Sequence, residues 1–216
     1  MSRILLLFMS LAMVACAKNS TEQCYQSMPS LESFDGRPAI LVIGDSISMG
    51  YGPYVRESLD QYDVQHNPCN AYDSRNTARR IDGWLKTRSS WHAITFNNGI
   101  WDQTVGDTWV GDDEYRANLT FIARAIKART ARPLFILSTE IPVNTPDRLN
   151  ARIVRKNEIA VEVMDAEGIP WLDLYSYSRT INHLHSRAAE QDDVHFTEEG
   201  YEALAEKVLE ALNPSL

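Results

Sequence analysis

Five short runs of mostly apolar residues recur along the chain, with longer polar segments between them. Most of these runs are rich in β-branched or aromatic residues, and glycine or asparagine follows several of them. Unbroken apolar runs of this length are typical of strands that are buried on both faces of a sheet. We therefore predict strands at 39–43, 63–66, 93–96, 133–137 and 169–174, of which 63–66 is the least apolar.

The segments between these runs carry helical patterns. Apolar residues recur at three- and four-residue spacing in 113–130 and again in 148–167, which predicts a helix in each. A last helix is predicted to begin after Thr197, whose hydroxyl can cap it, and to end before Pro214. Alternating strands and helices predict an α/β domain, in which helices cover both faces of a parallel sheet. Functional residues of such sheets lie beyond the carboxyl ends of the strands.

Length, composition and charge narrow the class of protein. A chain of 216 residues suits one α/β domain, and a hydrophobic share of 44% is that of a soluble globular protein. The 21 Lys and Arg residues against 29 Asp and Glu give a net charge of −8, which argues against a nucleic-acid partner because phosphates attract clustered basic residues. No histidine and cysteine spacing typical of zinc sites occurs in the sequence, so we expect neither a metal nor a cofactor.

The N-terminus has the pattern of a secretory leader. Arg3 precedes an apolar run over 4–15 that is too short to serve as a membrane span. We therefore predict a leader at 1–15, a polar tether at 16–37 and one catalytic domain at 38–216. This organisation predicts an exported protein of the bacterial periplasm or outer membrane.

Two cleavage sites compete in this leader. Met-Val-Ala-Cys at 13–16 resembles a bacterial lipobox, in which Cys16 is lipidated and becomes the first mature residue. The alternative is an Ala-x-Ala site with cleavage before Lys18. A buried N-terminal helix is disfavoured because a polar segment follows at once. We favour the lipoprotein, whose contact with the membrane would be made only through the lipid.

The chain contains three cysteines. Once Cys16 is lipidated or removed, Cys24 and Cys69 remain, and an oxidising compartment permits a disulfide between them. Two free thiols are the alternative, because spacing in the sequence does not set the distance between the two Cα atoms.

A candidate nucleophile follows the first predicted strand, in the sequence Gly44-Asp45-Ser46. A serine on a tight turn between a strand and a helix can present its Oγ atom at the open edge of the sheet, close to backbone N–H groups. The alternative is that Ser46 merely caps a helix that starts near Met49.

A candidate base lies just before the last predicted helix. Asp192 precedes His195 by three residues. A serine hydroxyl is a poor nucleophile until an imidazole takes its proton, and that imidazole needs its other nitrogen held in place. An aspartate and a histidine on one short loop can meet both needs for Ser46.

Taken together, Gly44-Asp45-Ser46 and Asp192-x-x-His195 resemble the first and last sequence blocks of the SGNH hydrolases. The resemblance implies a flavodoxin-like three-layer α/β/α fold with a five-stranded parallel sheet, no metal, and ester hydrolysis through an acyl-enzyme. Its catalytic residues here would be Ser46, His195 and Asp192. An ordinary α/β-hydrolase fits worse, because Ser48 stands where the motif G-x-S-x-G needs its second glycine.

The two middle blocks of the family depart from the usual pattern. Arg75 occupies the position of a glycine whose backbone N–H helps to bind the oxyanion. In the third block, which begins at Gly99, the expected asparagine is Trp101. The indole N–H of Trp101 is one candidate for the missing donor, and the neighbouring Asn97 and Asn98 are the others.

The family resemblance therefore predicts a serine carboxylic-ester hydrolase. Analogy within the family favours small acyl groups on a carbohydrate or another small ester as the substrate. Two alternatives use the same residues: an acyltransferase that passes the acyl group to a sugar hydroxyl, and an impaired protein that binds glycan without turning it over. The departure at Trp101 motivates the second alternative.

Overall fold

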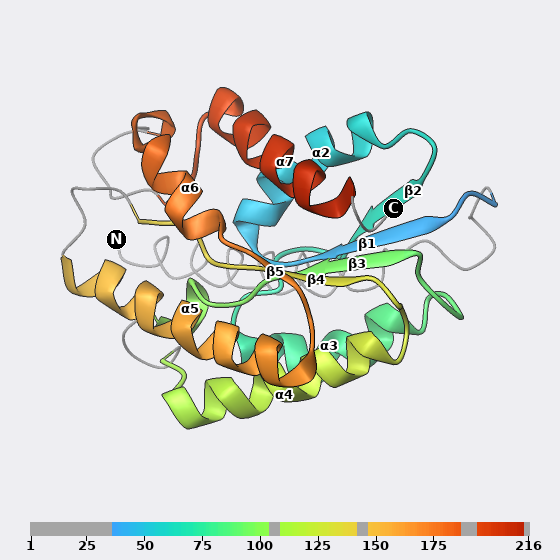
Figure 1. Ribbon diagram of the computed structural model, residues 1–216, viewed down its shortest axis with the longest axis horizontal. Helices are drawn as coiled ribbons and strands as arrows, with labels where there is room; N and C mark the ends of the chain where they lie inside the picture. The colour runs from blue at the N-terminus through green and yellow to red at the C-terminus, as the bar shows by residue number, and fades with distance from the viewer. Residues whose placement is uncertain (1–35, 104–108, 142–146, 187–193, 214–216) are drawn as a thin grey trace, which may run out of the picture.

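The computed structural model describes residues 36–103, 109–141, 147–186 and 194–213 (Figure 1). They build one parallel sheet with the strand order β2-β1-β3-β4-β5. The strands are β1 (Ala39–Ile43), β2 (Asp63–His66), β3 (Ala93–Phe96), β4 (Pro133–Ile136) and β5 (Trp171–Leu172).

Helices cover both faces of this sheet, as Figure 1 shows. One face carries α2 (Ser46–Ser58), α6 (Leu174–Thr180) and α7 (Glu198–Leu212), and the other carries α3 (Ser74–Leu85), α4 (Asp112–Lys127) and α5 (Asp147–Glu167). Two short 3-10 helices, η2 (Trp101–Gln103) and η3 (Asn182–Leu184), complete the order. The predicted three-layer fold with a five-stranded parallel sheet is confirmed.

The alternation of side chains along β1 creates two cores. Leu41 and Ile43 pack in the core on the side of α3, α4 and α5, whereas Ile40 and Val42 pack in the core that contains residues of α2 and α7. Successive side chains of a strand point to opposite faces, so a strand covered on both faces must be apolar throughout. All five residues of β1 are buried, as its unbroken apolar run requires.

The last strand is shorter than predicted, since only Trp171–Leu172 of the run 169–174 is paired. Pro170 has no N–H to give to the ladder. Asp173 ends the strand because its side chain caps α6, accepting a hydrogen bond from the N–H of Ser176 at 2.9 Å.

Thr197 and Asp45 cap the two helices that lie nearest to the site. The last helix begins after Thr197, whose Oγ1 accepts a hydrogen bond from the N–H of Gly200 at 3.2 Å, as predicted. The suggestion that Ser46 caps a helix starting near Met49 is wrong. Ser46 is the first residue of α2, and Asp45 is its cap, because the Asp45 side chain accepts from the N–H of Ile47.

Cys69 is disulfide-bonded. Its predicted partner Cys24 lies outside the described residues, as does Cys16, so the pairing of Cys24 with Cys69 stays a prediction. The predicted boundaries of the leader and tether, at 1–15 and 16–37, also fall almost wholly outside them. Within the described ranges, none of the helices has both the length and the apolar character needed to cross a membrane. In the same ranges, no group of three or more His, Cys, Asp or Glu could hold a metal ion.

Helices α2 and α7 pack closely because α2 has a glycine at the contact. A Cβ atom added at Gly50 would lie 2.2 Å from the ring of Tyr201 on α7. By contrast, a Cβ atom at Gly83 on α3 would meet nothing within 4 Å.

Gly50→Ala should therefore lower the free energy of unfolding by about 1–3 kcal/mol, because overpacking at the contact outweighs the better helix propensity of alanine. Gly83→Ala is the matched control and should raise it by up to about 1 kcal/mol. Urea unfolding monitored by circular dichroism measures both. Equal effects of the two substitutions would contradict the close contact between α2 and α7.

Candidate active site

The turn after β1 places Ser46 at the carboxyl edge of the sheet. The N–H of Gly44 donates to Asn67 Oδ1 at 2.8 Å, which ties the turn to the segment after β2. A Cβ atom at Gly44 would lie 2.6 Å from Ser48 Oγ, so the turn has no room for a side chain there. Asp45 then caps α2 and leaves Ser46 half-buried at the start of the helix.

Ser46 and His195 are brought together across almost the whole chain. His195 Nε2 lies 2.8 Å from Ser46 Oγ, a distance suited to proton transfer. Asp192, the predicted third member of the triad, lies outside the described residues, so its role remains a prediction.

The backbone of His195 is held in place by the segment that follows η3. The N–H of Ser186 donates to the carbonyl of His195 at 2.8 Å. His185 and Phe196 form an isolated antiparallel bridge, and their rings stack with centroids 4.0 Å apart. Since Thr197 caps α7 two residues later, His195 sits between two fixed points.

Asp45 is a buried carboxylate beside this pair, with only 2% of its surface exposed. Burial raises the pKa of the Asp45 carboxyl to about 6, although the hydrogen bond from the N–H of Ile47 and the charge of His195 both lower it. Its Oδ2 atom has no hydrogen-bond partner among the described residues. When ionised, Asp45 places a negative charge close to His195.

The buried ring of His66 contacts Ser48 in the turn that follows β1. Ser48 Oγ lies 2.7 Å from the carbonyl of Asp45 and 2.8 Å from His66 Nε2, and its single hydrogen can be donated to only one of them at a time. His66 Nδ1 lies 2.7 Å from the carbonyl of Asn67 and must carry a hydrogen to donate there. Burial lowers the pKa of His66 to about 4, so the ring is neutral near pH 7 and its Nε2 atom is an acceptor. Sequence reasoning gave His66 no role, because Ser48 is 18 positions away.

Two backbone N–H groups remain open near Ser46. The first N–H groups of a helix have no acceptor within the helix. In α3, Asp102 accepts from the N–H of Ser74 and Asp73 accepts from that of Asn76. The N–H groups of Ser46 and Arg75 have no acceptor among the described residues, which makes them the candidate oxyanion donors.

The side chain of Arg75 explains how an arginine replaces a glycine at this position. Its Nε and Nη2 atoms form two hydrogen bonds of 2.6 Å to the carboxylate of Glu114, and Nη2 also donates to the carbonyl of Trp109 at 3.0 Å. The side chain is thus directed to the start of α4, while only its backbone is needed near Ser46. The start of α3 is held close to the nucleophile turn because the N–H of Ala71 donates to the carbonyl of Gly44 at 3.0 Å.

Asn97 is not available as an oxyanion donor. Its Nδ2 atom donates to the carbonyl of Ile136 at 2.8 Å and to Ser138 Oγ at 3.4 Å, which uses both amide hydrogens. Gly99 is required for packing, since a Cβ atom there would lie 2.2 Å from Ser138 Oγ and its φ is +154°. Both residues therefore shape the end of β3.

Asn98 is likewise committed elsewhere. Its Nδ2 atom donates to Thr77 Oγ1 at 3.0 Å and to the carbonyl of Tyr72 at 3.2 Å. The prediction that Asn98 donates to the oxyanion is therefore corrected together with that for Asn97, because long-range hydrogen bonds occupy both amides. Trp101 is half-buried, and its ring meets that of Tyr72 edge to face, with centroids 5.1 Å apart.

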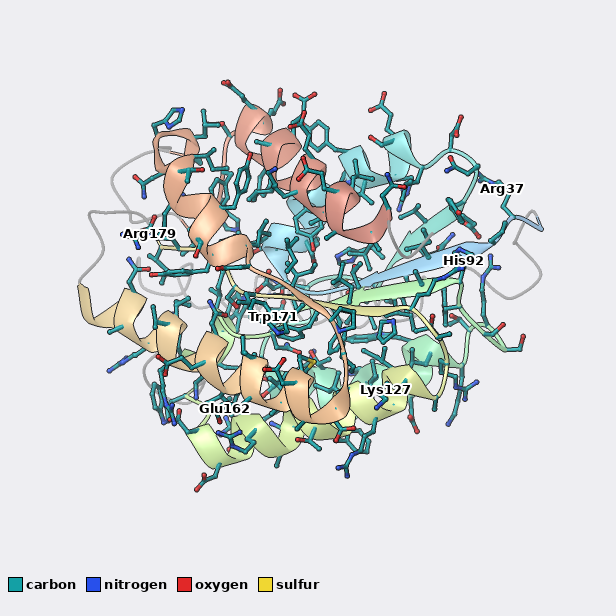
Figure 2. All side chains as sticks on the ribbon, viewed as in Figure 1. Arg37, His92, Lys127, Glu162, Trp171 and Arg179 are labelled. Atoms are coloured by element: carbon teal, nitrogen blue, oxygen red, sulfur yellow. The ribbon has the colours of Figure 1, made fainter. Side chains whose placement is uncertain are left out.

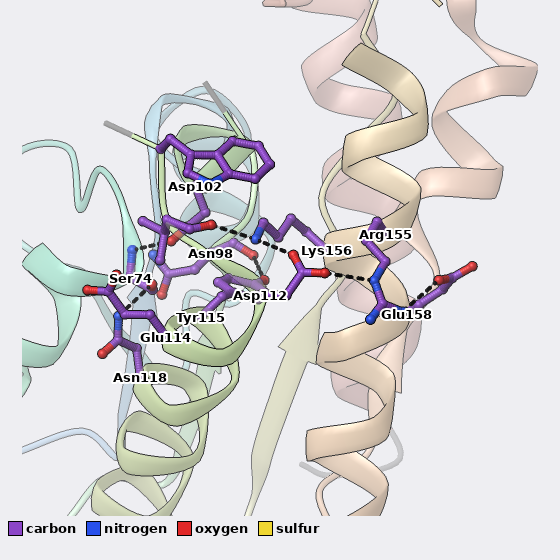
Figure 3. A network of polar contacts seen from close by, with 12 residues as sticks. Ser74, Asn98, Asp102, Asp112, Glu114, Tyr115, Asn118, Arg155, Lys156 and Glu158 are labelled. Carbon is purple, nitrogen blue, oxygen red and sulfur yellow. Dashed lines mark hydrogen bonds and ion pairs between the residues drawn. The ribbon is translucent and has the colours of Figure 1, made fainter. Parts of the chain in front are cut away.

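A buried network of polar contacts holds the start of α3 in place (Figure 3). Asp102 is fully buried, and its Oδ1 atom accepts from the N–H of Ser74 at 2.9 Å. Asn118 on α4 donates to Ser74 Oγ at 3.0 Å. Burial raises the pKa of Asp102 to about 7, while the hydrogen bonds from Ser74 lower it. Ser74, which precedes Arg75, is thereby hydrogen-bonded both to Asp102 and to Asn118 on α4.

The sequence matches the model of the GDSL-like lipase/acylhydrolase family over residues 42–203, well over half of the chain. The protein belongs to this family. The resemblance to the SGNH hydrolases is thereby confirmed, and this GDSL-like protein is a hydrolase of the esterase type in general terms. No match was found among curated proteins.

Solved structures agree with this GDSL-like fold. A lipase/acylhydrolase from Enterococcus faecalis is 19% identical with a TM-score of 0.68, and the match covers 82% of this chain and 96% of that one. A catalytic mutant of Axe2, an acetylxylan esterase from Geobacillus stearothermophilus, is 17% identical with a TM-score of 0.68 and coverages of 80% and 93%. A member of the lipolytic G-D-S-L family from Veillonella parvula is 18% identical with a TM-score of 0.67 and coverages of 81% and 98%.

Asp102 should make the stability of this GDSL-like protein depend on pH. Its raised pKa means that the folded state binds a proton more tightly than the unfolded state. The resulting stabilisation is complete below about pH 4 and is lost as the pH rises through about 7. Asp102→Asn keeps an acceptor for the N–H of Ser74 but removes this dependence, which is on the order of 2–4 kcal/mol.

Unfolding free energies from pH 4 to pH 8 measure the difference between wild type and Asp102→Asn. The control is Asp82→Asn, at an exposed carboxylate on α3. Parallel pH curves for wild type and Asp102→Asn would show that folding does not raise the pKa of Asp102.

Proposed function

We propose that the chain is a serine carboxylic-ester hydrolase that works through an acyl-enzyme. The observation that carries the proposal is the 2.8 Å contact between Ser46 Oγ and His195 Nε2. In the first step, Ser46 Oγ attacks the ester carbonyl carbon while His195 Nε2 takes its proton. The N–H groups of Ser46 and Arg75 bind the oxyanion that forms.

The rest of the cycle uses the same groups. His195 returns the proton to the alcohol oxygen as the bond between the acyl carbon and that oxygen breaks. A water molecule then attacks the acyl-enzyme, and His195 takes a proton from it. Collapse of the second intermediate releases the acid, and Ser46 regains its proton. Asp192 would orient the imidazole, and the buried Asp45 adds negative charge near the imidazolium.

The substrate proposed is a small acyl group on a carbohydrate. Its support comes from the aromatic pair of Tyr72 and Trp101, at the same edge as Ser46. Tyr72 is 36% exposed, and its φ of 55° lies in the left-handed region that bulky residues avoid. The strained backbone is held by Asn70 Oδ1, which accepts from the Tyr72 N–H at 2.7 Å, and by Asn98.

Backbone strain of this kind collects where function requires it. Held in this conformation, the Tyr72 ring offers an apolar surface and a hydroxyl group, a combination suited to a sugar ring. The acetylxylan esterase among the structural neighbours is consistent with such a substrate. The replacement of asparagine by Trp101 favours a second candidate, an impaired protein that binds glycan without turnover.

Substitution of the reacting pair tests the mechanism. Ser46→Ala and His195→Ala should each lower kcat/KM for p-nitrophenyl acetate by roughly 10⁴-fold or more, because an unassisted serine is a weak nucleophile. The double variant should be little worse than either single one, since the two residues act as a unit.

Ser58→Ala and His183→Ala are the controls, because both side chains are exposed and lie outside the site. Wild-type turnover in Ser46→Ala would refute the mechanism. An inactive wild type that still binds xylooligosaccharide would favour the impaired protein. With a xylooligosaccharide added as acceptor, formation of acetylated sugar instead of free acetic acid would indicate an acyltransferase.

Removal of the Tyr72 ring tests the substrate. Tyr72→Asn keeps a residue that tolerates the left-handed backbone. It should lower kcat/KM for an acetylated xylooligosaccharide by about 10-fold, and that for p-nitrophenyl acetate by much less. Phe121→Asn, at an exposed ring on α4, controls for the loss of an aromatic side chain. Equal losses on both substrates would count against a sugar contact at Tyr72.

A further inference from the structure

A cavity of about 670 Å³ opens at the edge of the sheet opposite to Ser46. Its walls come from residues 37–39, 88–92 and 131–132, which lie at or just before the amino ends of β1, β3 and β4. The strands are parallel, so their amino ends share one edge, whereas Ser46 follows the carboxyl end of β1. Figure 2 shows the labelled Arg37 and His92 together at this edge.

The cavity gathers positive charge in a chain whose net charge is −8. Three arginines line it: Arg37, Arg88 and Arg132. Arg88 forms an ion pair with Asp63, and Arg37 donates to a backbone carbonyl. Arg132 contacts the ring of His92, and in the described part of the chain no carboxylate lies within ion-pair distance of it. The charge of Arg132 is therefore not balanced locally.

His92 holds the guanidinium of Arg132 without cancelling its charge. Burial and the charge of Arg132 both lower the pKa of the His92 ring, which is therefore neutral near pH 7 and can accept a hydrogen bond. The ring of Tyr62 packs against it, with centroids 5.0 Å apart. Arg132 is thus positioned by a neutral partner, with its positive charge available to a ligand.

Two hydroxyl groups add further donors to the same wall. Ser89 and Ser90 are exposed and line the cavity, and their side chains form no hydrogen bond with the described residues. Planar guanidinium groups match pairs of phosphate oxygens, and serine hydroxyls bind phosphate as single donors.

We propose that this cavity binds the phosphate group of a phosphate ester, with Arg132 and Arg37 as its main ligands. The cavity is much larger than one phosphate ion, so it has room for part of the alcohol that carries the phosphate. Two sources share this chemistry: a soluble phosphate ester and the headgroup of a membrane lipid. The chain enters the described domain at Gly36, so a lipid on Cys16 would be connected at this same edge. The proposal does not depend on the esterase mechanism.

The experiment measures binding to the whole protein and to three variants. Calorimetry at low salt follows the titration of glycerol 3-phosphate. Co-sedimentation compares vesicles of phosphatidylcholine alone with vesicles that also contain phosphatidylglycerol. Arg132→Gln and Arg37→Gln remove one charge each from the cavity. Arg124→Gln is the matched control, because it removes one exposed charge that pairs with Glu167 and does not line the cavity.

We expect Arg132→Gln and Arg37→Gln each to weaken binding about 10-fold or more, and Arg124→Gln to change it less than twofold. If Arg132→Gln and Arg37→Gln weaken the binding of glycerol 3-phosphate, a soluble phosphate ester is sufficient as the ligand. If the two variants weaken only the binding to vesicles that contain phosphatidylglycerol, the ligand is a lipid headgroup. Absence of binding in both assays, or an equal loss in all three variants, would overturn the proposal.

Discussion

β1 is hydrogen-bonded along both of its edges, to β2 and to β3, and the positions of Ser46 and of the proposed oxyanion donors depend on this double pairing. Beyond the strand ends, the N–H of Ala71 still reaches the carbonyl of Gly44, and the N–H of Asn97 reaches that of Ile43. The segments that follow β2 and β3 contain the second and third sequence blocks. These hydrogen bonds extend the pairing of the strands and so hold both segments next to the turn that carries Ser46. At the start of α3, the residue before Arg75 is also hydrogen-bonded to Asp102 and to Asn118.

Three ionisable side chains lie buried around that edge: Asp45, His66 and Asp102. Burial shifts the pKa of each toward its neutral form, to about 6, about 4 and about 7 respectively. Such shifted groups are costly to keep and gather at functional sites. Near pH 7, His66 is neutral and serves as a hydrogen-bonding group, whereas Asp45 is largely ionised and places its negative charge close to His195.

The pair of Ser46 and His195, which lie 149 positions apart, was predicted from two short motifs and from their resemblance to the first and last blocks of the family. Local patterns in the sequence were enough to predict the strands and the last helix. Each depends on residues that are adjacent or regularly spaced, such as the apolar run of β1 or the cap at Thr197. The oxyanion donors could not be assigned in the same way. The amide of Asn97 is occupied by a carbonyl 39 positions away, and Asp102 accepts from an N–H 28 positions away. Partners at that separation become visible only when the sheet is assembled.

The packing of α2 against α7 at Gly50 has a consequence for the timing of activity. α2 is the first helix of the described domain and carries Ser46, whereas α7 is the last and directly follows His195. A ribosome must therefore complete almost the entire domain before nucleophile and base can meet. Until then the emerging chain lacks the contact between Ser46 Oγ and His195 Nε2.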